Sequence, residues 1–587
     1  MPPRLQFRAL PWASQLLAYS RPSWKCSSCR HARPTPIARR GFATAAPRLA
    51  DKQYYVTTPI FYVNAGMSFR ISPFHCLQNA EAPHVGHLYT MVLADILKRW
   101  RVLLGEDDAQ LLTGTDEHGM KVQQAAQAAG MDTQAFCDRN HKTFEALAKA
   151  ANLDNDHFIR TTDPAHKEAV RYFWEMLSHR GYIYPAKHEG WYSVSDETFY
   201  PPKQVQSDLD PSTGKKRMVS AVTGSEVEWS SETNYHFRLS AFQDRLLELY
   251  ETGFLTPEKY MTHVVQSVSS GLQDLSISRP AERLSWGIPV PGDSSQTIYV
   301  WLDALVNYLT KAGYPFPPGQ EERLGWPADI HVVGKDITRF HCVYWPAFLM
   351  ALDLPLPRRV LAHGHWTINH EKMSKSTGNV VNPFFAIDRF GVDPMRFYLA
   401  RMGNVAEDSN YDNAYIIACY KKLLQSGIGN ITSRTIGCAK GNLRSFIVNA
   451  ASNQLPPATP RDEEYQAFVE KVPMEVAGHM KDLDTQAAVR SITVMIEQAN
   501  KYFHEREPWS KSPESQRVIY NVSETLRISA ILLQPFMPTK ASELLDILKV
   551  DRELAKRRFS ATAYGSDPDY GDGVQKRILF PPLIVEE

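Results

Sequence analysis

Apolar runs with the spacing of strands and of helices alternate along the first two thirds of the chain. Residues 54–63 are β-branched and aromatic and predict a buried strand, and the apolar run 110–115 predicts a second. After His87, apolar residues recur every three or four positions and predict a helix. The later runs 298–303 and 330–336 also end on polar residues. This alternation predicts an α/β fold with a Rossmann-type parallel sheet, which binds its ligand at the carboxyl ends of the strands.

The pattern changes twice further along the chain. Residues 185–285 show short strands and turns, which predict an inserted connective domain, and the pattern is purely helical from about residue 412 onward. We therefore predict a leader at 1–50, a first catalytic half at 51–184, the inserted domain at 185–285, a second catalytic half at 286–411, an all-α bundle at 412–550 and a C-terminal tail at 551–587.

Charge is distributed unevenly along the 587 residues. The net charge is +1, but residues 1–50 hold eight Arg and one Lys and no acid, which leaves 56 basic and 64 acidic residues in the rest. An Arg-rich leader without acids is typical of a mitochondrial transit peptide, with cleavage expected between Phe42 and Ala43. The alternative is a basic arm that stays attached and binds RNA. No apolar stretch is long enough to predict a membrane span.

Two short motifs carry the candidate chemistry. His84-Val85-Gly86-His87 stands where the first helix begins, so free backbone N–H groups and the helix dipole predict an anion site there. Lys372-Met373-Ser374-Lys375-Ser376 offers two mobile positive charges, which suit a departing pyrophosphate. Taken singly, the first motif is also compatible with a solvated helix cap or half a metal site, and the second with an exposed basic loop. Neither a G-x-G-x-x-G nor a P-loop motif occurs in the sequence.

Together these motifs resemble the signature of class I aminoacyl-tRNA synthetases. Four further segments, 55–64, 112–119, 300–305 and 334–341, make residues 52–545 similar to a methionyl-tRNA synthetase of the mitochondrial or bacterial type. The resemblance implies methionine-binding roles for Ile60, Tyr62, Asp116, Trp301, Ala304, Tyr308, Ile337 and His341. It implies ATP-binding roles for His84, Gly86, His87, Asp336, Lys372, Met373, Ser374, Lys375 and Ser376.

The resemblance further implies that His84, Gly86, His87, Lys372 and Lys375 are the catalytic residues, that Asp116 holds the methionine ammonium group, and that ATP enters with Mg²⁺ as substrate. A soft, donor-free thioether suits the aromatic residues of such a pocket. In the helical region, Asn430 and Arg434 share a helix face and resemble an anticodon reader, and Trp509 is placed to stack on a base. The implied partners are methionine, ATP and tRNA(Met), and we expect a monomer in the mitochondrial matrix.

The chain departs from the family at two places. Where zinc-binding members carry C-x-x-C pairs in the inserted domain, residues 190–197 contain no cysteine, so we predict no structural zinc and no other metal site. The 16 residues 66–81 also separate two segments that are nearly continuous in the family. We interpret them as a retained intron or an error in the gene model. The alternative is a true insertion, which either bulges outward at little entropic cost or misplaces His84.

Two other functions remain open from the sequence alone. The chain could be a class I synthetase for leucine, valine or cysteine, although it lacks a large editing insertion and cysteine ligands for zinc. It could also be a catalytically inactive RNA-binding protein. Amino-acid-dependent ATP–pyrophosphate exchange separates the three.

Overall fold

The computed structural model describes residues 52–63, 83–193, 198–200, 202–210, 214–221, 223–317, 319–373, 380–510 and 512–583. The predicted leader and residues 66–81 lie outside these ranges, as do Ser374, Lys375 and Ser376. Asp51–Glu587 forms one compact unit. None of its described helices combines the length and the apolar character that crossing a bilayer requires.

A parallel sheet forms the centre of the catalytic region. Its strands, in spatial order, are β10 (Leu255–Thr256), β16 (Arg359–His363), β15 (Ile330–Gly334), β1 (Tyr55–Thr57), β3 (Gln110–Asp116) and β2 (Phe61–Tyr62), and β4 (His157–Arg160) also pairs with β3. The helices of this region are α1 (Val85–Leu104), α2 (Met120–Ala128), α3 (Thr133–Ala150), α4 (Pro164–His179), α5 (Gln243–Tyr250), α6 (Glu258–Ser269), α7 (Val300–Lys311) and α8 (Trp345–Ala351). The predicted α/β fold is therefore confirmed. The strand order reverses at β1, between β3 and β15, which is where such sheets bind ligands.

Two strand predictions need correction. The run 54–63 forms two strands, β1 and β2, because Pro59 has no N–H to continue the ladder. The run 298–303 is not a strand of the parallel sheet: the antiparallel strand β14 (Asp293–Ile298) ends at its first residue, and residues from Val300 onward form α7. A short buried apolar run does not by itself distinguish a strand from a buried helix.

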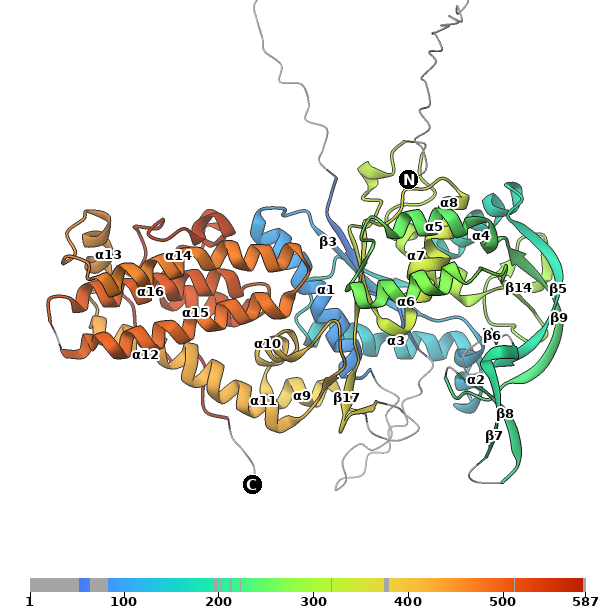
Figure 1. Ribbon diagram of the computed structural model, residues 1–587, viewed down its shortest axis with the longest axis horizontal. Helices are drawn as coiled ribbons and strands as arrows, with labels where there is room; N and C mark the ends of the chain where they lie inside the picture. Colours follow the sequence, from blue (N-terminus) through green and yellow to red (C-terminus); the bar gives the residue numbers. More distant parts are fainter. Residues whose placement is uncertain are drawn as a thin grey trace, which may run out of the picture. The chain divides into compact units, whose positions relative to one another are not determined.

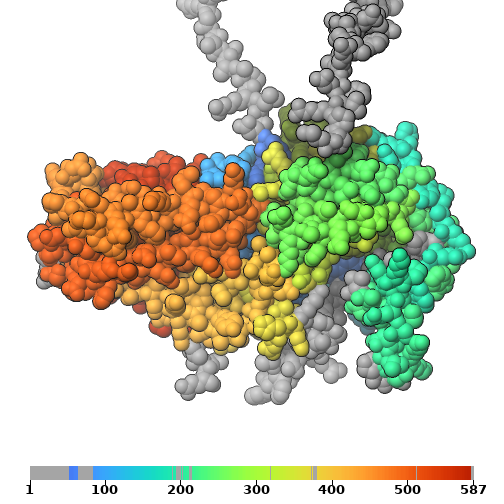
Figure 2. Space-filling view, viewed as in Figure 1, coloured from blue at the N-terminus to red at the C-terminus, as the bar shows by residue number. Residues whose placement is uncertain are grey.

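The inserted region is antiparallel. Its main sheet has the order β11 (Leu275–Ser276), β9 (Glu228–Phe237), β5 (Ile183–Ser193) and β6 (Thr198–Tyr200). A second sheet contains β12 (Ser278–Pro280), β14 and β13 (Pro289–Val290), and the hairpin of β7 (Val205–Leu209) and β8 (Lys216–Ser220) projects from this region in Figure 2. One part of the predicted range 185–285 is not inserted, because β10 pairs with β16 of the parallel sheet. The other domain limits stay predictions.

Helices dominate the last third of the chain, at the orange and red end in Figure 1. After β17 (Trp366–Ile368) and β18 (Glu371–Lys372) come α9 (Pro383–Phe390) and α10 (Val392–Met402), and then β19 (Ser409–Asn410). The remaining helices are α11 (Asn413–Cys419), a π-helical stretch (Tyr420–Gly429), α12 (Asn430–Ala439), α13 (Leu443–Ala451), α14 (Pro460–Lys481), α15 (Thr485–Arg506), α16 (Ser515–Leu533), α17 (Pro538–Ile547) and α18 (Leu554–Arg557). Apolar residues at helical spacing are buried on α15: Val489, Ile492, Ile496, Ala499 and Phe503.

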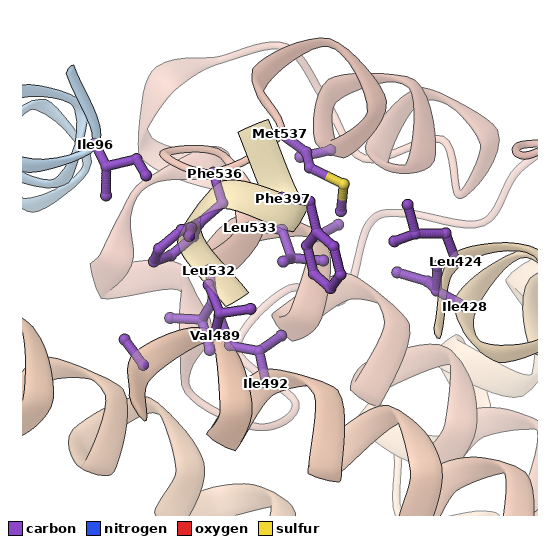
Figure 3. Close-up of a cluster of buried hydrophobic side chains, with 14 of the residues drawn as sticks. Ile96, Phe397, Leu424, Ile428, Val489, Ile492, Leu532, Leu533, Phe536 and Met537 are labelled. Atoms are coloured by element: carbon purple, nitrogen blue, oxygen red, sulfur yellow. The ribbon is translucent and has the colours of Figure 1, made fainter. Parts of the chain in front are cut away.

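One continuous hydrophobic core joins the bundle to the catalytic region. In Figure 3, Ile96 of α1, Phe397 of α10 and Val489 of α15 belong to the same cluster. A buried arginine, Arg396, lies in this junction and forms an ion pair with Asp95 of α1 at 2.5 Å. The same guanidinium donates to the carbonyls of Ala151, Pro535 and Phe536, which ties α1 to the turn between α16 and α17.

Candidate active site

A cavity of about 410 Å³ opens at the carboxyl ends of β1, β3 and β15. Every predicted methionine-binding residue lines it: Ile60, Tyr62, Asp116, Trp301, Ala304, Tyr308, Ile337 and His341. Of the predicted ATP-binding residues, His84, Gly86, His87, Asp336 and Met373 line the same cavity. The structure thus brings together residues that are nearly 300 positions apart in the sequence.

The cavity also contains residues that the sequence did not single out: Pro59, Phe61, Thr90, Lys121, Val300, Leu305, Gly334, His363, Gly364, His365 and Trp366. Four of these follow one another directly at the end of β16. The sequence could have indicated these four residues, because they follow an apolar run, the same pattern that pointed to Asp116 and Asp336. Thr90 and Lys121 lie on helices, and no comparable pattern marks them.

The first turn of α1 is closed by its own histidines. The Gly86 N–H donates to Nδ1 of His84 at 3.0 Å, and the His84 N–H donates to Nδ1 of His87 at 3.1 Å. Val85 and His87 donate their N–H groups to the carbonyls of Val381 and His84. The prediction of free backbone N–H groups at this helix end is therefore wrong, because histidine side chains and backbone carbonyls accept their hydrogen bonds.

The histidine side chains themselves can bind an anion at this helix end. Because each Nδ1 accepts a backbone N–H, the proton of a neutral imidazole is on Nε2 in both residues. The two rings stack with centroids 3.8 Å apart, and His87 packs edge-on against Phe61 at 5.1 Å. Gly86 permits this arrangement, since a Cβ there would lie 2.8 Å from the His84 ring. A phosphate at this end of α1 would meet two imidazoles and the positive end of the helix dipole.

The described flanks of the second motif lie beside the first motif. Lys372 ends β18, which pairs with β17, and its neighbour Met373 lines the cavity together with His84 and His87. On the other side of the undescribed residues 374–379, the Val381 carbonyl accepts the N–H of Val85 at 3.2 Å. Both flanks of the motif therefore lie at the N-terminus of α1. The Lys372 side chain and the whole of Lys375 lie outside what the structure describes.

The deep wall of the cavity is apolar and uncharged. His341 lies 3.0 Å from the Ile337 carbonyl through Nδ1, so Nδ1 carries the proton and Nε2 accepts the Tyr308 hydroxyl at 2.7 Å. Burial lowers the pKa of His341 to about 4, against the opposing effect of the Ile337 carbonyl, so the ring is neutral at physiological pH. Trp301 completes this wall and stacks on Phe340 with centroids 3.5 Å apart.

Charged groups lie around the rim and at one point inside. Asp116 is 6 % exposed at the end of β3 and supplies a carboxylate to the cavity. Asp336 lies at the rim, 3.2 Å from Nε2 of His365. A neighbouring cavity of about 460 Å³ shares Asp336, and an ion pair between Lys335 and Asp408 lies in its lining. Among the described residues, no group of three or more His, Cys, Asp or Glu is placed to hold a metal ion.

The predicted anticodon residues lie together in the bundle. Asn430 and Arg434 are one turn apart on α12, and Asn430 is exposed. The Arg434 guanidinium lies 4.9 Å from the Phe503 ring centroid and 5.2 Å from that of Trp509. Trp509, which follows α15, is 43 % exposed. A cation and an accessible indole therefore share one surface, a combination that can stack and hydrogen-bond an unpaired base.

Comparisons with known proteins agree with this geometry. Residues 54–436 match the family model described as tRNA synthetases class I (M). The chain is 47% identical to the probable mitochondrial methionine–tRNA ligase of Neurospora crassa, over 99% of this chain and 94% of that protein. It is 46% identical to the protein of the same name in Schizosaccharomyces pombe, over 88% and 94%. Mycobacterium tuberculosis methionyl-tRNA synthetase in complex with methionyl-adenylate has a TM-score of 0.81 and 37% identity, over 90% of this chain and all of that chain.

The chain therefore belongs to the class I tRNA synthetases. Within that class it belongs to the methionine–tRNA ligases, as its relatives and structural neighbours agree. The alternative of a leucine, valine or cysteine enzyme is not supported by these relatives. The prediction of no structural zinc stays a prediction, since residues 194–197 of the relevant segment are not described.

Proposed function

We propose that the chain ligates methionine to mitochondrial tRNA(Met) through a methionyl-adenylate, with release of pyrophosphate and AMP. The observation that carries this proposal is the shared cavity, where an apolar wall and the buried Asp116 carboxylate meet His84, His87 and Met373 of the two motifs. The solved relative that carries methionyl-adenylate supports it, because it aligns with nine tenths of this chain.

In the first step the methionine carboxylate attacks the α-phosphorus of ATP, which enters with Mg²⁺. One P–O bond forms, the bond to the bridging oxygen breaks, and pyrophosphate leaves. The carboxylate is already ionised, so no general base is needed, and catalysis consists of positioning and charge stabilisation. We assign the phosphates to His84 and His87 on one side and to Lys372 and Lys375 on the other.

The cavity wall accounts for the choice of amino acid. Asp116 would pair with the ammonium group at the rim of the apolar region. Tyr308 and neutral His341 satisfy each other's polar atoms, so the wall near the side chain favours a thioether over a charged group. Trp301 supplies the broad aromatic contact. Aliphatic competitors differ by about one methylene, which is worth about 1–3 kcal/mol, so shape does most of the discrimination.

In the second step a ribose hydroxyl at the tRNA 3′ end attacks the carbonyl carbon of the adenylate. The ester forms, the mixed anhydride breaks and AMP leaves. The reader for the anticodon would be Asn430, Arg434 and Trp509, with Trp509 stacking on a base and the other two bonding base edges. This division puts amino-acid activation and tRNA recognition in different parts of the chain.

The site of action we propose is the mitochondrial matrix. The acid-free, Arg-rich residues 1–50 support it, and so do the mitochondrial names of the relatives from Neurospora crassa and Xenopus laevis. Sequencing the N-terminus of protein purified from the organelle tests it: Ala43 is expected first, and an intact Met1 would contradict cleavage. We further propose a monomer, which light scattering of the purified protein would check.

The decisive experiment for the activity is ATP–pyrophosphate exchange with a panel of amino acids and no tRNA. Methionine is expected to support exchange, whereas leucine, valine and cysteine are not. Exchange with another amino acid would reassign the substrate, and exchange with none would indicate an inactive RNA-binding protein.

A further inference from the structure

A single buried carboxylate, Asp303, is shared by two histidines behind the active-site cavity. Its Oδ2 lies 2.6 Å from Nδ1 of His118, and its Oδ1 lies 2.7 Å from Nε2 of His166. Nδ1 of His166 is held in turn by the hydroxyl of Thr310 at 3.0 Å. Asp303 is 1 % exposed and does not line the cavity, so none of the roles assigned above uses it.

The three residues come from three different elements, of which β3 and α7 line the pocket. Asp303 lies in the first turn of α7, His118 lies two residues beyond Asp116 at the end of β3, and His166 lies on α4. Trp301, Ala304, Leu305 and Tyr308 of α7 face the cavity at helical spacing. Asp303 is offset from that face, so it holds α7 from another side.

Asp303 is ionised, which strengthens its hydrogen bonds to His118 and His166. Burial by itself would raise the pKa of Asp303, but the charge and hydrogen bonds of His118 and His166 outweigh it and lower the pKa to about 2. An ionised buried carboxylate requires both partners, because losing one leaves a desolvated charge incompletely compensated. The three elements are therefore not free to shift independently.

The residue next to Asp116, Glu117, is anchored to a neighbouring strand of the parallel sheet. Glu117 is fully buried and forms two hydrogen bonds with Arg160 of β4, at 2.8 and 2.9 Å. It also accepts the Thr162 hydroxyl at 2.5 Å. The two residues that follow Asp116 are thus both anchored, Glu117 to β4 and His118 to α7.

We propose that Asp303 is a positioning residue for methionine activation: it sets the spacing between the ammonium site at Asp116 and the aromatic face of α7 at the other end of the substrate. This inference rests on the proposed methionine-binding role of that cavity. It assigns Asp303 and His118 to substrate geometry, and it gives them no contact with methionine or ATP.

The test uses matched substitutions in the full chain and measures ATP–pyrophosphate exchange. Asp303→Asn cannot accept hydrogen bonds on both sides, so it is expected to raise the KM for methionine about tenfold, while the KM for ATP and kcat change less than about twofold. His118→Asn keeps a donor where Nδ1 stood and is expected to retain a near-normal KM. His118→Gln moves that donor and is expected to raise the KM as Asp303→Asn does.

Glu524→Gln is the control, because Glu524 forms an equally buried pair with Arg527 in the bundle. It is expected to lower the melting temperature and leave the KM for methionine unchanged. If Asp303→Asn and His118→Gln lower kcat and the melting temperature at an unchanged methionine KM, their role is structural only and the proposal is overturned. If Asp303→Asn does not fold, the two His118 variants decide the question. Absence of methionine-dependent exchange in the unaltered chain would instead refute the proposed function.

Discussion

The backbone N–H of Val85 donates a hydrogen bond to the carbonyl oxygen of Val381 at 3.2 Å. Val85 is the first residue of α1, and Val381 closely follows the lysine motif 372–376, so this bond joins the flanks of the two motifs. The histidine motif and the described flanks of the lysine motif therefore lie at one end of one cavity, as a triphosphate held between the two motifs requires. The predictions below test this arrangement and the surfaces that depend on it.

Substituting Gly86 by alanine should displace His84. The added Cβ would lie 2.8 Å from the His84 ring, and the ring would have to move out of its stack with His87. We expect exchange activity to fall about 100-fold, since misplacing a substrate-positioning group by about 1 Å costs that much, with little change in the methionine KM. Gly437→Ala is the control, because no atom lies within 4 Å of that Cβ. Normal exchange in Gly86→Ala would contradict the role of His84.

Removing one lysine of the second motif should weaken transition-state stabilisation without weakening methionine binding. Lys375→Ala is expected to lower the rate of adenylate formation about 100-fold or more, as loss of a charge stabiliser does. A single-turnover assay of adenylate formation measures the rate, and equilibrium dialysis measures methionine binding. An equal loss of methionine affinity would argue against a pyrophosphate role for Lys375.

Loss of the exposed indole in the bundle should separate the two steps. Trp509→Ala is expected to cost about 1–3 kcal/mol of tRNA binding, the worth of stacking one base, and to leave exchange unchanged. Aminoacylation at varied tRNA concentration measures the first effect. Met474→Ala serves as the control, since Met474 is also an exposed apolar residue on the bundle. Reduced exchange with normal charging would refute the anticodon assignment.

Stability should fall on mild acidification because buried histidines resist protonation. Burial lowers the pKa of both His341 and His363 to about 4, against a value of about 6.5 in the unfolded chain. Between these values the unfolded state binds more protons, so the free energy of unfolding is full above about pH 6.5 and declines toward pH 4. The decline is about 1.4 kcal/mol per pKa unit for each ring.

Urea unfolding at several pH values in this window measures that slope. His341→Gln should make the profile shallower, because one titrating group is gone. Asp303 also loses its contribution on acidification, but only at lower pH, since its pKa is lowered to about 2. A free energy of unfolding that is constant or increasing from pH 6.5 to 4 would show that these rings are not buried as neutral groups.

Breaking the ion pair at the junction with the bundle should destabilise the whole unit. Arg396→Leu leaves the buried carboxylate of Asp95 with Arg99 as its remaining arginine partner and deprives three backbone carbonyls of their donor. We expect the free energy of unfolding to fall by about 3–5 kcal/mol. Arg552→Leu, at an exposed ion pair with Asp546, should change it little. Equal effects of the two substitutions would show that Arg396 does not stabilise the junction between the bundle and the catalytic region.

Sequencing the spliced transcript decides whether the 16 residues 66–81 belong to the protein. Deletion of this segment restores continuity with the family, and we keep the hypothesis of a retained intron or an error in the gene model. In the structure, His84 and His87 reach the cavity, and Phe61 before the segment contacts His87 after it. The alternative in which the segment misplaces His84 is therefore not what the structure shows. Spliced transcript that contains codons 66–81 would establish a true insertion.

The sequence by itself predicted the α/β class, the helical C-terminal region and the two ATP motifs, because local periodicity and short motifs carry that information. The resemblance to a family supplied the methionine-binding set, and all of it lines one cavity. What local patterns could not decide was how a short apolar run is paired. Residues 298–303 therefore proved to lead into a helix, and β10 proved to belong to the parallel sheet.

Only the tertiary structure decided the contacts between distant segments. The pairing of Thr90 with His363 spans 273 positions, and that of His118 with Asp303 spans 185, and no periodicity marks either pair. The same holds for the Val85 N–H at the start of α1, which donates to the distant Val381 carbonyl. The partner of each hydrogen-bonding group depends on the folded geometry. The candidate residues form a site only because the parallel sheet brings the ends of its strands together.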